Sequence, residues 1–195
     1  MTCLPVPDPR RWDRQPGDGA YARCERERRF LVRGDPVSAE PSRLIEDRYL
    51  TGTTLRLRRM TVGAESVWKL TQKVRPLDAD DPSDVRITNT YLSAEEHALL
   101  SSLPGVVLTK TRSLHPSGRH VLVVDEFLGR LRGLRLAELE VRELDEPVRL
   151  PDWIGREVTR DDRFSGGRLA AADDQQVRQL LEEVRSARAG TSPRV

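Results

Sequence analysis

The chain has 195 residues, of which 33 are Lys or Arg and 31 are Asp or Glu, giving a formal net charge of +2. This balance excludes a general polyanion-binding coat, and the presence of only two cysteines favours a reducing compartment. We find no apolar run of about 18 residues and no signal-peptide core. We therefore expect a cytoplasmic protein that does not enter membranes.

The two ends differ in composition from the middle of the chain. Residues 1–19 are rich in Pro and Gly and poor in apolar residues, which predicts a flexible N-terminal arm. Residues 190–195 predict a flexible tail. Residues 20–189 then form a single domain, large enough for a substantial core or a barrel.

The first predicted strand covers residues 24–32 and ends at the turn signal of residues 34–36. Alternation places Glu25, Glu27 and Arg29 on one side of this strand. Two carboxylates about 6.6 Å apart can hold one divalent cation, and the arginine can meet an anion brought by that cation. Taken alone, the stretch also fits an ordinary solvated strand face. Repetition of the pattern in later strands would favour a site.

The next segments lead through a series of short strands. Residues 42–50 are expected to pass through a short helical or turn segment, and residues 54–60, 67–73 and 85–92 alternate as strands. In each strand the basic and hydroxyl residues share one predicted face: Arg56 and Arg58, then Lys69, Thr71 and Lys73, then Arg86, Thr88 and Thr90.

A capping box from Ser93 to Glu96 predicts a helix over residues 93–103. Strands are expected over residues 106–113, with Lys110 and Arg112 on one face, and over residues 121–127, which include Asp125. A hairpin loop over residues 115–120 joins these two strands.

A further strand, residues 134–142, carries Glu138, Glu140 and Arg142 on one face. Residues 153–159 form a loop with a short ordered segment near the sheet. One long amphipathic helix is predicted over residues 169–189, with its apolar stripe used for core packing.

The charged strand faces are unusual in sign. Nine cations would line one surface, namely Arg29, Arg56, Arg58, Lys69, Lys73, Arg86, Lys110, Arg112 and Arg142. If the sheet closes into a barrel, this face becomes its interior, and the apolar residues face outwards beneath the helices. Buried cations repel one another unless an anion joins them, and an oligophosphate suits Arg and Lys well.

Carboxylates on the same surface need a cation between them and the phosphates, and hard oxygen ligands favour Mg²⁺ or Mn²⁺. Two Glu-x-Glu pairs stand on the first and the last long strand. They would close one metal site if those strands are neighbours.

These motifs together resemble a known family, the CYTH or triphosphate tunnel metalloenzyme superfamily. Residues 25–32 look like its signature, Glu-x-Glu-x-Lys followed by an apolar run. The similarity continues in order over residues 24–170, through 48–50, 56–58, 69–73, 110–112, 125–127, 133–140 and 155–159.

The resemblance implies an α+β fold, an eight-stranded antiparallel β-barrel or tunnel with flanking helices. It implies metal ligands at Glu25, Glu27, Glu138 and Glu140, with Asp125 and Glu157 nearby. Tyr49 would lie close enough to orient water, and Glu25, Glu27, Arg29 and Tyr49 form the implied catalytic set. The implied phosphate-binding residues are Arg29, Arg56, Arg58, Lys69, Lys73, Arg86, Lys110 and Arg112.

The sequence departs from the family pattern in two places. Arg29 stands where the signature has Lys, and an arginine cannot lose its proton to serve as a base. On the strand over residues 85–92, many relatives have acidic residues where this chain has Thr88, Asn89 and Thr90, which weakens a second metal site.

We therefore expect a metal-dependent phosphohydrolase acting on a small triphosphate, either inorganic tripolyphosphate or a nucleoside or thiamine triphosphate. A non-catalytic module that binds polyphosphate or a phosphorylated ligand is the alternative favoured by the two departures. An adenylate cyclase is a further alternative. A nucleic-acid-binding barrel is disfavoured, because the basic strands lack interleaved aromatic residues. We expect a monomer or homodimer.

Overall fold

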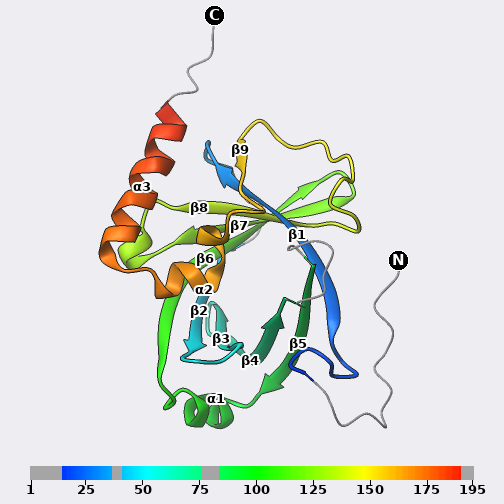
Figure 1. The fold of residues 1–195 in the computed structure, drawn as a ribbon, viewed down its shortest axis with the longest axis vertical. Coiled ribbons are helices and arrows are strands. Elements are labelled where there is room, and N and C mark those ends of the chain that lie inside the picture. Colours follow the sequence, from blue (N-terminus) through cyan, green and yellow to red (C-terminus); the bar gives the residue numbers. More distant parts are fainter. Residues whose placement is uncertain (1–14, 37–40, 76–83, 190–195) are drawn as a thin grey trace, which may run out of the picture.

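The computed structural model describes residues 15–36, 41–75 and 84–189 (Figure 1). Most of the predicted arm and all of the predicted tail lie outside these ranges. Among the described residues, no helix is long and apolar enough to span a membrane.

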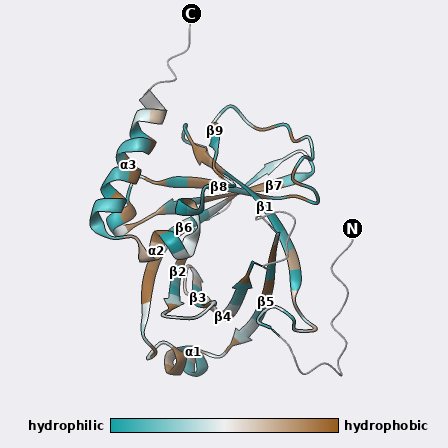
Figure 2. Ribbon diagram, viewed as in Figure 1, coloured by the Kyte–Doolittle hydropathy of each residue, from teal (hydrophilic) through white to brown (hydrophobic). Residues whose placement is uncertain are grey.

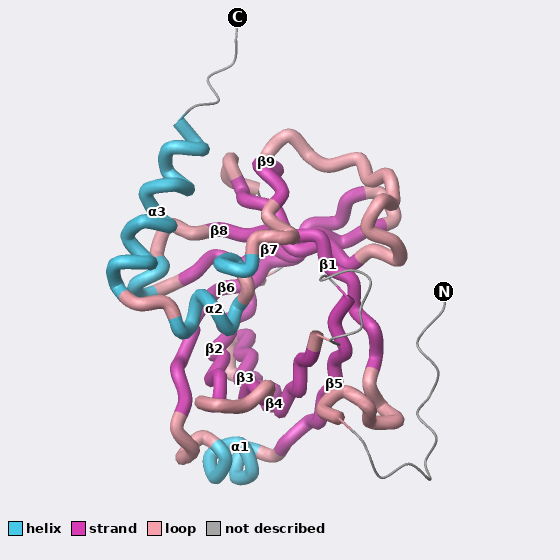
Figure 3. The backbone as a smooth tube through the Cα atoms, viewed as in Figure 1, coloured by secondary structure: helices cyan, strands magenta, loops and turns pink. Residues whose placement is uncertain are grey.

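Nine antiparallel strands form one sheet. They are β1 (Arg23–Val32), β2 (Arg43–Leu50), β3 (Leu55–Val62), β4 (Glu65–Val74), β5 (Asp84–Leu92), β6 (Gly105–Ser117), β7 (His120–Phe127), β8 (Arg135–Glu140) and β9 (Ile154–Glu157). Their order is β5-β4-β3-β2-β6-β7-β8-β1-β9, and a further pairing of β1 with β5 closes the ring (Figure 3). The predicted eight-stranded barrel is confirmed, with β9 added beside β1.

The two faces of the strands are covered differently. On the outer face, Phe30, Val124 and Leu139 form an apolar cluster with the segment over residues 141–154. On the inner face, which we call the lumen, charged positions give way further along the strands to apolar ones such as Leu31 and Leu136. Hydrophilic and hydrophobic residues are accordingly mixed along the strands (Figure 2).

The helices α2 (Gly166–Ala171) and α3 (Asp174–Ala189) pack onto these apolar lumen positions. The expectation that the last helix covers an outward apolar face is therefore wrong. It is also wrong that residues 169–189 form one helix. Asp173 and Gln176 bond reciprocally to each other's backbone N–H at 2.8 and 2.9 Å, and this cap begins a new helix.

The helix α1 (Ala94–Leu100) begins at the predicted capping box. Ser93 Oγ accepts from the Glu96 N–H at 3.1 Å, and the Glu96 carboxylate accepts from the Ser93 N–H at 2.7 Å. The helix packs against β4 and β5. The predicted start of the helix is confirmed, but the helix ends at Leu100, before the predicted residue 103.

Two predictions about the strands are corrected. Residues 42–50 are not helical, because β2 lies in the middle of the sheet, where it pairs with β6 along its whole length and with β3 over residues 44–49. The predicted loop over residues 115–120 shrinks to a tight turn, since β6 continues to Ser117 and β7 starts at His120. The short ordered segment after residue 153 is β9, which pairs with β1.

Candidate functional site

The two strands that carry the Glu-x-Glu pairs are neighbours. In the ladder between β1 and β8, Glu27 lies opposite Glu140 and Arg29 lies opposite Glu138. Directly opposed residues of antiparallel strands point to the same face, so these side chains share the lumen. Glu25 shares it as well, at the point where β1 pairs with β5.

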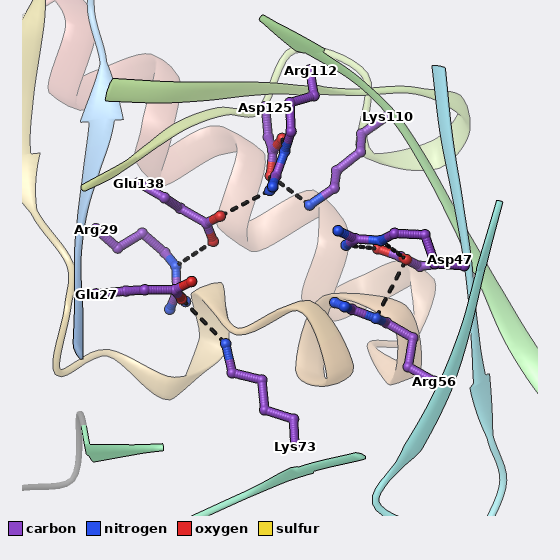
Figure 4. A network of polar contacts seen from close by, with 10 residues as sticks. Glu27, Arg29, Asp47, Arg56, Lys73, Lys110, Arg112, Asp125 and Glu138 are labelled. Carbon is purple, nitrogen blue, oxygen red and sulfur yellow. Dashed lines mark hydrogen bonds and ion pairs between the residues drawn. The ribbon is translucent and has the colours of Figure 1, made fainter. Parts of the chain in front are cut away.

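A chain of ion pairs links these acids to the cations of β4 and β6 (Figure 4). Lys73 Nζ lies 3.2 Å from the Glu27 carboxylate, and Arg29 Nη2 lies 3.6 Å from the same carboxylate. Arg29 Nε donates to Glu138 at 3.3 Å, and Arg112 Nη2 donates to Glu138 at 2.9 Å. Arg29 therefore lies between two of the acids.

Asp125 of β7 is fully engaged by cations. Its carboxylate, 1% exposed, accepts two hydrogen bonds from Arg112 at 2.6 and 2.7 Å and one from Lys110 at 2.5 Å. These bonds hold Lys110 and Arg112 in place. Asp125 lies beside the acids as expected, but it acts on the cations in this arrangement.

The acids respond to their surroundings in opposite ways. Burial alone would raise the pKa of Glu138, but Arg112 and Arg29 hold it well below its usual range. The pKa of Glu25 is raised, first by burial and then by the negative charges of Glu27 and Glu140.

The mutual repulsion of Glu25, Glu27 and Glu140 would be relieved by a cation, and carboxylate oxygens are the ligands that Mg²⁺ and Mn²⁺ prefer. The donor chemistry of these residues therefore fits a divalent ion. As the side chains stand, no three acids, histidines or cysteines among the described residues form a ready metal-binding group.

The opposite wall of the lumen is built around Asp47 of β2, which is 0% exposed. Its carboxylate accepts from Arg58 Nε at 2.6 Å and from Arg58 Nη2 at 2.7 Å, and Arg56 Nε lies 3.4 Å away. Burial would raise the pKa of Asp47, but Arg56 and Arg58 lower it strongly. Asp47 is an ionised anchor for two arginines.

Lys69 of β4 lies opposite Arg58 and faces the lumen. Its ammonium group makes no hydrogen bond or ion pair with another residue in the described part of the chain. Burial, Arg58 and Arg56 together lower the pKa of its ammonium group to about 8. Lys69 is therefore a lumen cation available to an anion.

The prediction that Arg86, Thr88 and Thr90 line the lumen is wrong. The register with β1 and β4 places Val85, Ile87 and Asn89 inside. Arg86 points to the other face, where it donates to Asp18 at 2.5 Å. Arg142 also leaves the lumen set, because β8 ends at Glu140 and the Arg142 side chain is exposed.

Glu157 is not brought to the lumen acids either. It lies on β9, where Arg28 Nε and Nη2 donate to its carboxylate at 3.1 and 2.7 Å. Arg28 alternates with Arg29 along β1 and points to the outer face. The structure thus separates Glu157 from Glu25, Glu27, Glu138 and Glu140.

Tyr49 faces the lumen from β2, opposite Arg56 of β3. Burial and Asp47 raise the pKa of its hydroxyl, which is hydrogen-bonded to Arg56. The hydroxyl lies so close to Gly166 that a Cβ added there would be 2.1 Å from it. Tyr49 is therefore close to the site, as expected, and it contacts a phosphate-clamp candidate.

Sequence reasoning missed two features of the lumen. Asp47 was not identified because residues 42–50 were not assigned to a strand, and the adjacent acids Glu46 and Asp47 give this segment no single charged face. The hydrogen bond from Thr71 Oγ1 to Asn89 at 2.7 Å had no local signal, because it joins different strands.

Comparison with known proteins gives a consistent result. No protein-family model matches the chain. An inorganic triphosphatase from Acetivibrio thermocellus is 50% identical over 46 residues, which are 24% of this chain and 30% of that protein. The match thus spans less than a third of the length of that relative.

Solved structures extend the similarity to most of the chain. The inorganic triphosphatase NE1496 is 25% identical, with a TM-score of 0.53, over 76% of this chain and 95% of that chain. A putative adenylate cyclase from Bacillus halodurans is 18% identical, with a TM-score of 0.41, over 63% of this chain and 83% of that chain. The resemblance to triphosphate tunnel proteins is confirmed by the first of these structures and by the curated relative.

Proposed function

Because this chain shares its barrel with a solved inorganic triphosphatase, we propose that it hydrolyses the terminal phosphoanhydride bond of a small triphosphate, preferably inorganic tripolyphosphate. The observation that carries the proposal is the division of one lumen into two walls. Acids of β1 and β8 stand on one wall, and cations of β3, β4 and β6 face them. A metal-bound oligophosphate has charges that match both walls.

Mg²⁺ or Mn²⁺ is the proposed cofactor, and Glu25, Glu27, Glu138 and Glu140 are the residues that would hold it. When bound, it would supply charge neutralisation and polarisation of the phosphoryl group. Glu157 is left out of this set because it lies on the outer face with Arg28, and Asp125 because its carboxylate accepts three hydrogen bonds from Arg112 and Lys110.

The chain's own cations bind and orient the anion. Arg29 and Lys73 stand beside the acids, and Lys110 and Arg112 are held by Asp125. Arg56 and Lys69 approach from the other wall. Because Arg29 keeps its proton, it serves as a fixed positive charge that aligns the terminal phosphoryl group for attack by water.

The test is phosphate release from tripolyphosphate, ATP and thiamine triphosphate, each with Mg²⁺, with Mn²⁺ and with a chelator. Metal-dependent release that is fastest from tripolyphosphate is the expected result. No release from any substrate, together with a rise in melting temperature on adding tripolyphosphate, would replace the hydrolase with a binding module. Pyrophosphate from ATP in place of orthophosphate would instead indicate a cyclase.

A further inference from the structure

We propose that Asp47 is a positioning residue, which holds Arg58 and orients Arg56 so that Arg56 and Lys69 receive one end of the triphosphate. This inference rests on the proposed function, since it concerns the same lumen. It assigns separate tasks to cations that look equivalent in the sequence.

Arg58 is committed to Asp47. Its Nε and Nη2 both donate to the carboxylate, at 2.6 and 2.7 Å, in the paired arrangement that suits an arginine fork. Arg58 itself is buried, with 5% of its surface exposed. The fork edge of Arg58 is thus turned to a protein anion and away from any ligand.

Arg56 has an N–H group that lacks an acceptor. Its Nε is buried without a hydrogen-bond partner, 3.4 Å from the Asp47 oxygen that Arg58 already uses. Its Nη2 lies 3.4 Å from Thr71 Oγ1, and Tyr49 shares a hydrogen bond with it. A buried unsatisfied donor is costly, and a phosphate oxygen would satisfy it.

The charge of this wall suits one phosphoryl group. Arg56, Arg58 and Lys69 contribute three positive charges and Asp47 one negative charge, so the sum is +2. A terminal phosphate carries about −1.5 to −2 at neutral pH. Without Asp47 the wall would hold three close cations that repel one another.

The test compares two ion pairs made by adjacent residues. Asp47→Asn breaks the pair with Arg58 inside the lumen, whereas Glu46→Gln breaks the pair with Arg59 on the outer face of the same two strands. Melting temperature, tripolyphosphate affinity in metal-free buffer, kcat and KM are measured for both variants.

Asp47→Asn is expected to lower the melting temperature by several degrees, because a buried arginine loses its partner. Tripolyphosphate should bind it more tightly than it binds the wild type, since the wall has gained a positive charge. Its kcat per folded molecule should fall at least about tenfold, since Arg56 and Arg58 are no longer fixed. Glu46→Gln should change kcat and affinity less than about twofold.

A wild-type kcat for Asp47→Asn would overturn the proposal, as would kcat and affinity falling together in proportion to the folded fraction. If Asp47→Asn does not fold, the double variant Asp47→Asn/Arg58→Gln restores the charge balance. It should fold and remain at least about tenfold slow, and a wild-type kcat would again overturn the proposal.

Failure of the proposed function would look different. In that case the wild type would release no phosphate from any triphosphate. Melting temperatures would still test the role of Asp47. Adding tripolyphosphate should raise the melting temperature of Asp47→Asn by more than it raises that of the wild type. An equal or smaller increment would overturn the inference.

Discussion

Arg29 of β1 lies directly opposite Glu138 of β8, and its Nε donates to the Glu138 carboxylate at 3.3 Å. The same guanidinium lies 3.6 Å from Glu27. A permanent cation thus stands between two acids of the lumen. Together with Arg112, it lowers the pKa of Glu138 and so keeps that carboxylate ionised, which a lysine able to lose its proton would do less reliably.

Arg29→Gln should destabilise the protein by about 3 kcal/mol, because it leaves Glu27 and Glu138 short of a positive charge in a buried site. Arg28→Gln is the matched control one residue earlier. Its partner Glu157 is exposed, so the loss there should be about 1 kcal/mol or less. Urea unfolding measures the free energy of unfolding of both variants. Equal losses would contradict the placement of Arg29 in the lumen and Arg28 on the outer face.

Glu138→Gln should lower phosphate release at least about 100-fold, because it removes an acid of the proposed metal set. Glu157→Gln should retain activity within about twofold, since its carboxylate lies on the outer face with Arg28. Metal-dependent kcat is the measurement. A comparable loss in both variants would return Glu157 to the site.

Arg86→Gln should leave KM for the triphosphate unchanged within about twofold, because Arg86 pairs with Asp18 outside the lumen. Arg56→Gln should raise KM at least about tenfold, as the loss of a charge-assisted contact predicts. The assay is steady-state kinetics on the substrate that the wild type prefers. A large increase of KM in Arg86→Gln would indicate that β5 turns its Arg86 face to the lumen.

The pKa of about 8 at Lys69 predicts pH-dependent anion binding. Below pH 8 the ammonium is charged, and above it the charge is lost, so the Kd for tripolyphosphate in metal-free buffer should rise by up to about tenfold per pH unit. Lys69→Arg is the control, because its guanidinium stays charged while the tripolyphosphate titrates as it does with the wild type. Its Kd should not show the increase above pH 8. The same increase of Kd above pH 8 in both proteins would exclude Lys69 as its source.

The lowered pKa of Lys69 also affects the free energy of unfolding, which should increase with pH, whereas anion binding should weaken with pH. The folded pKa of Lys69 is lowered from 10.5, so between about pH 8 and 10.5 the unfolded chain binds a proton that the folded chain does not. At Lys69 stability therefore rises with pH across this window. The rise should disappear in Lys69→Gln when unfolding is compared at both ends of the window.

Gly166→Ala should displace the Tyr49 ring and lower kcat at least about tenfold, since the new Cβ would lie 2.1 Å from the Tyr49 hydroxyl. Gly167→Ala is the control. There the Cβ would lie 3.8 Å from the ring, an ordinary contact. Equal activity of both variants would show that the position of Tyr49 does not matter.

Alternation along the chain predicted most of the strands, and the family resemblance implied that they close into a barrel, but whether β1 and β8 are neighbours was left open. It succeeded at Glu25, Glu27 and Arg29 because each side chain follows a strict two-residue period beside an apolar run. It failed at β5, because alternation sorts residues into two faces without saying which is inside. Both faces there mix apolar and polar side chains, and only pairing with β1 and β4 places Val85 in the lumen and Arg86 outside.

Asp47 could not be found for a different reason. Glu46 and Asp47 are adjacent acids, so the segment does not look like a strand with one charged face. Their separation becomes evident only through their partners, Arg59 outside and Arg58 inside. The pairing of β2 with β3 therefore determines which of the two acids faces the lumen, and the local sequence pattern does not.

Closure of the ring depends on strands from both ends of the sequence. β1 is made first, yet its partners β5, β8 and β9 follow it by roughly 50 to 130 residues of chain, with β8 ending at Glu140 and β9 at Glu157. Until β8 emerges from the ribosome, the cations of β3, β4 and β6 face solvent without the acids of β8. The ring can therefore close only late in synthesis, and we expect the docking of β1 between β5 and β8 to govern its rate of folding.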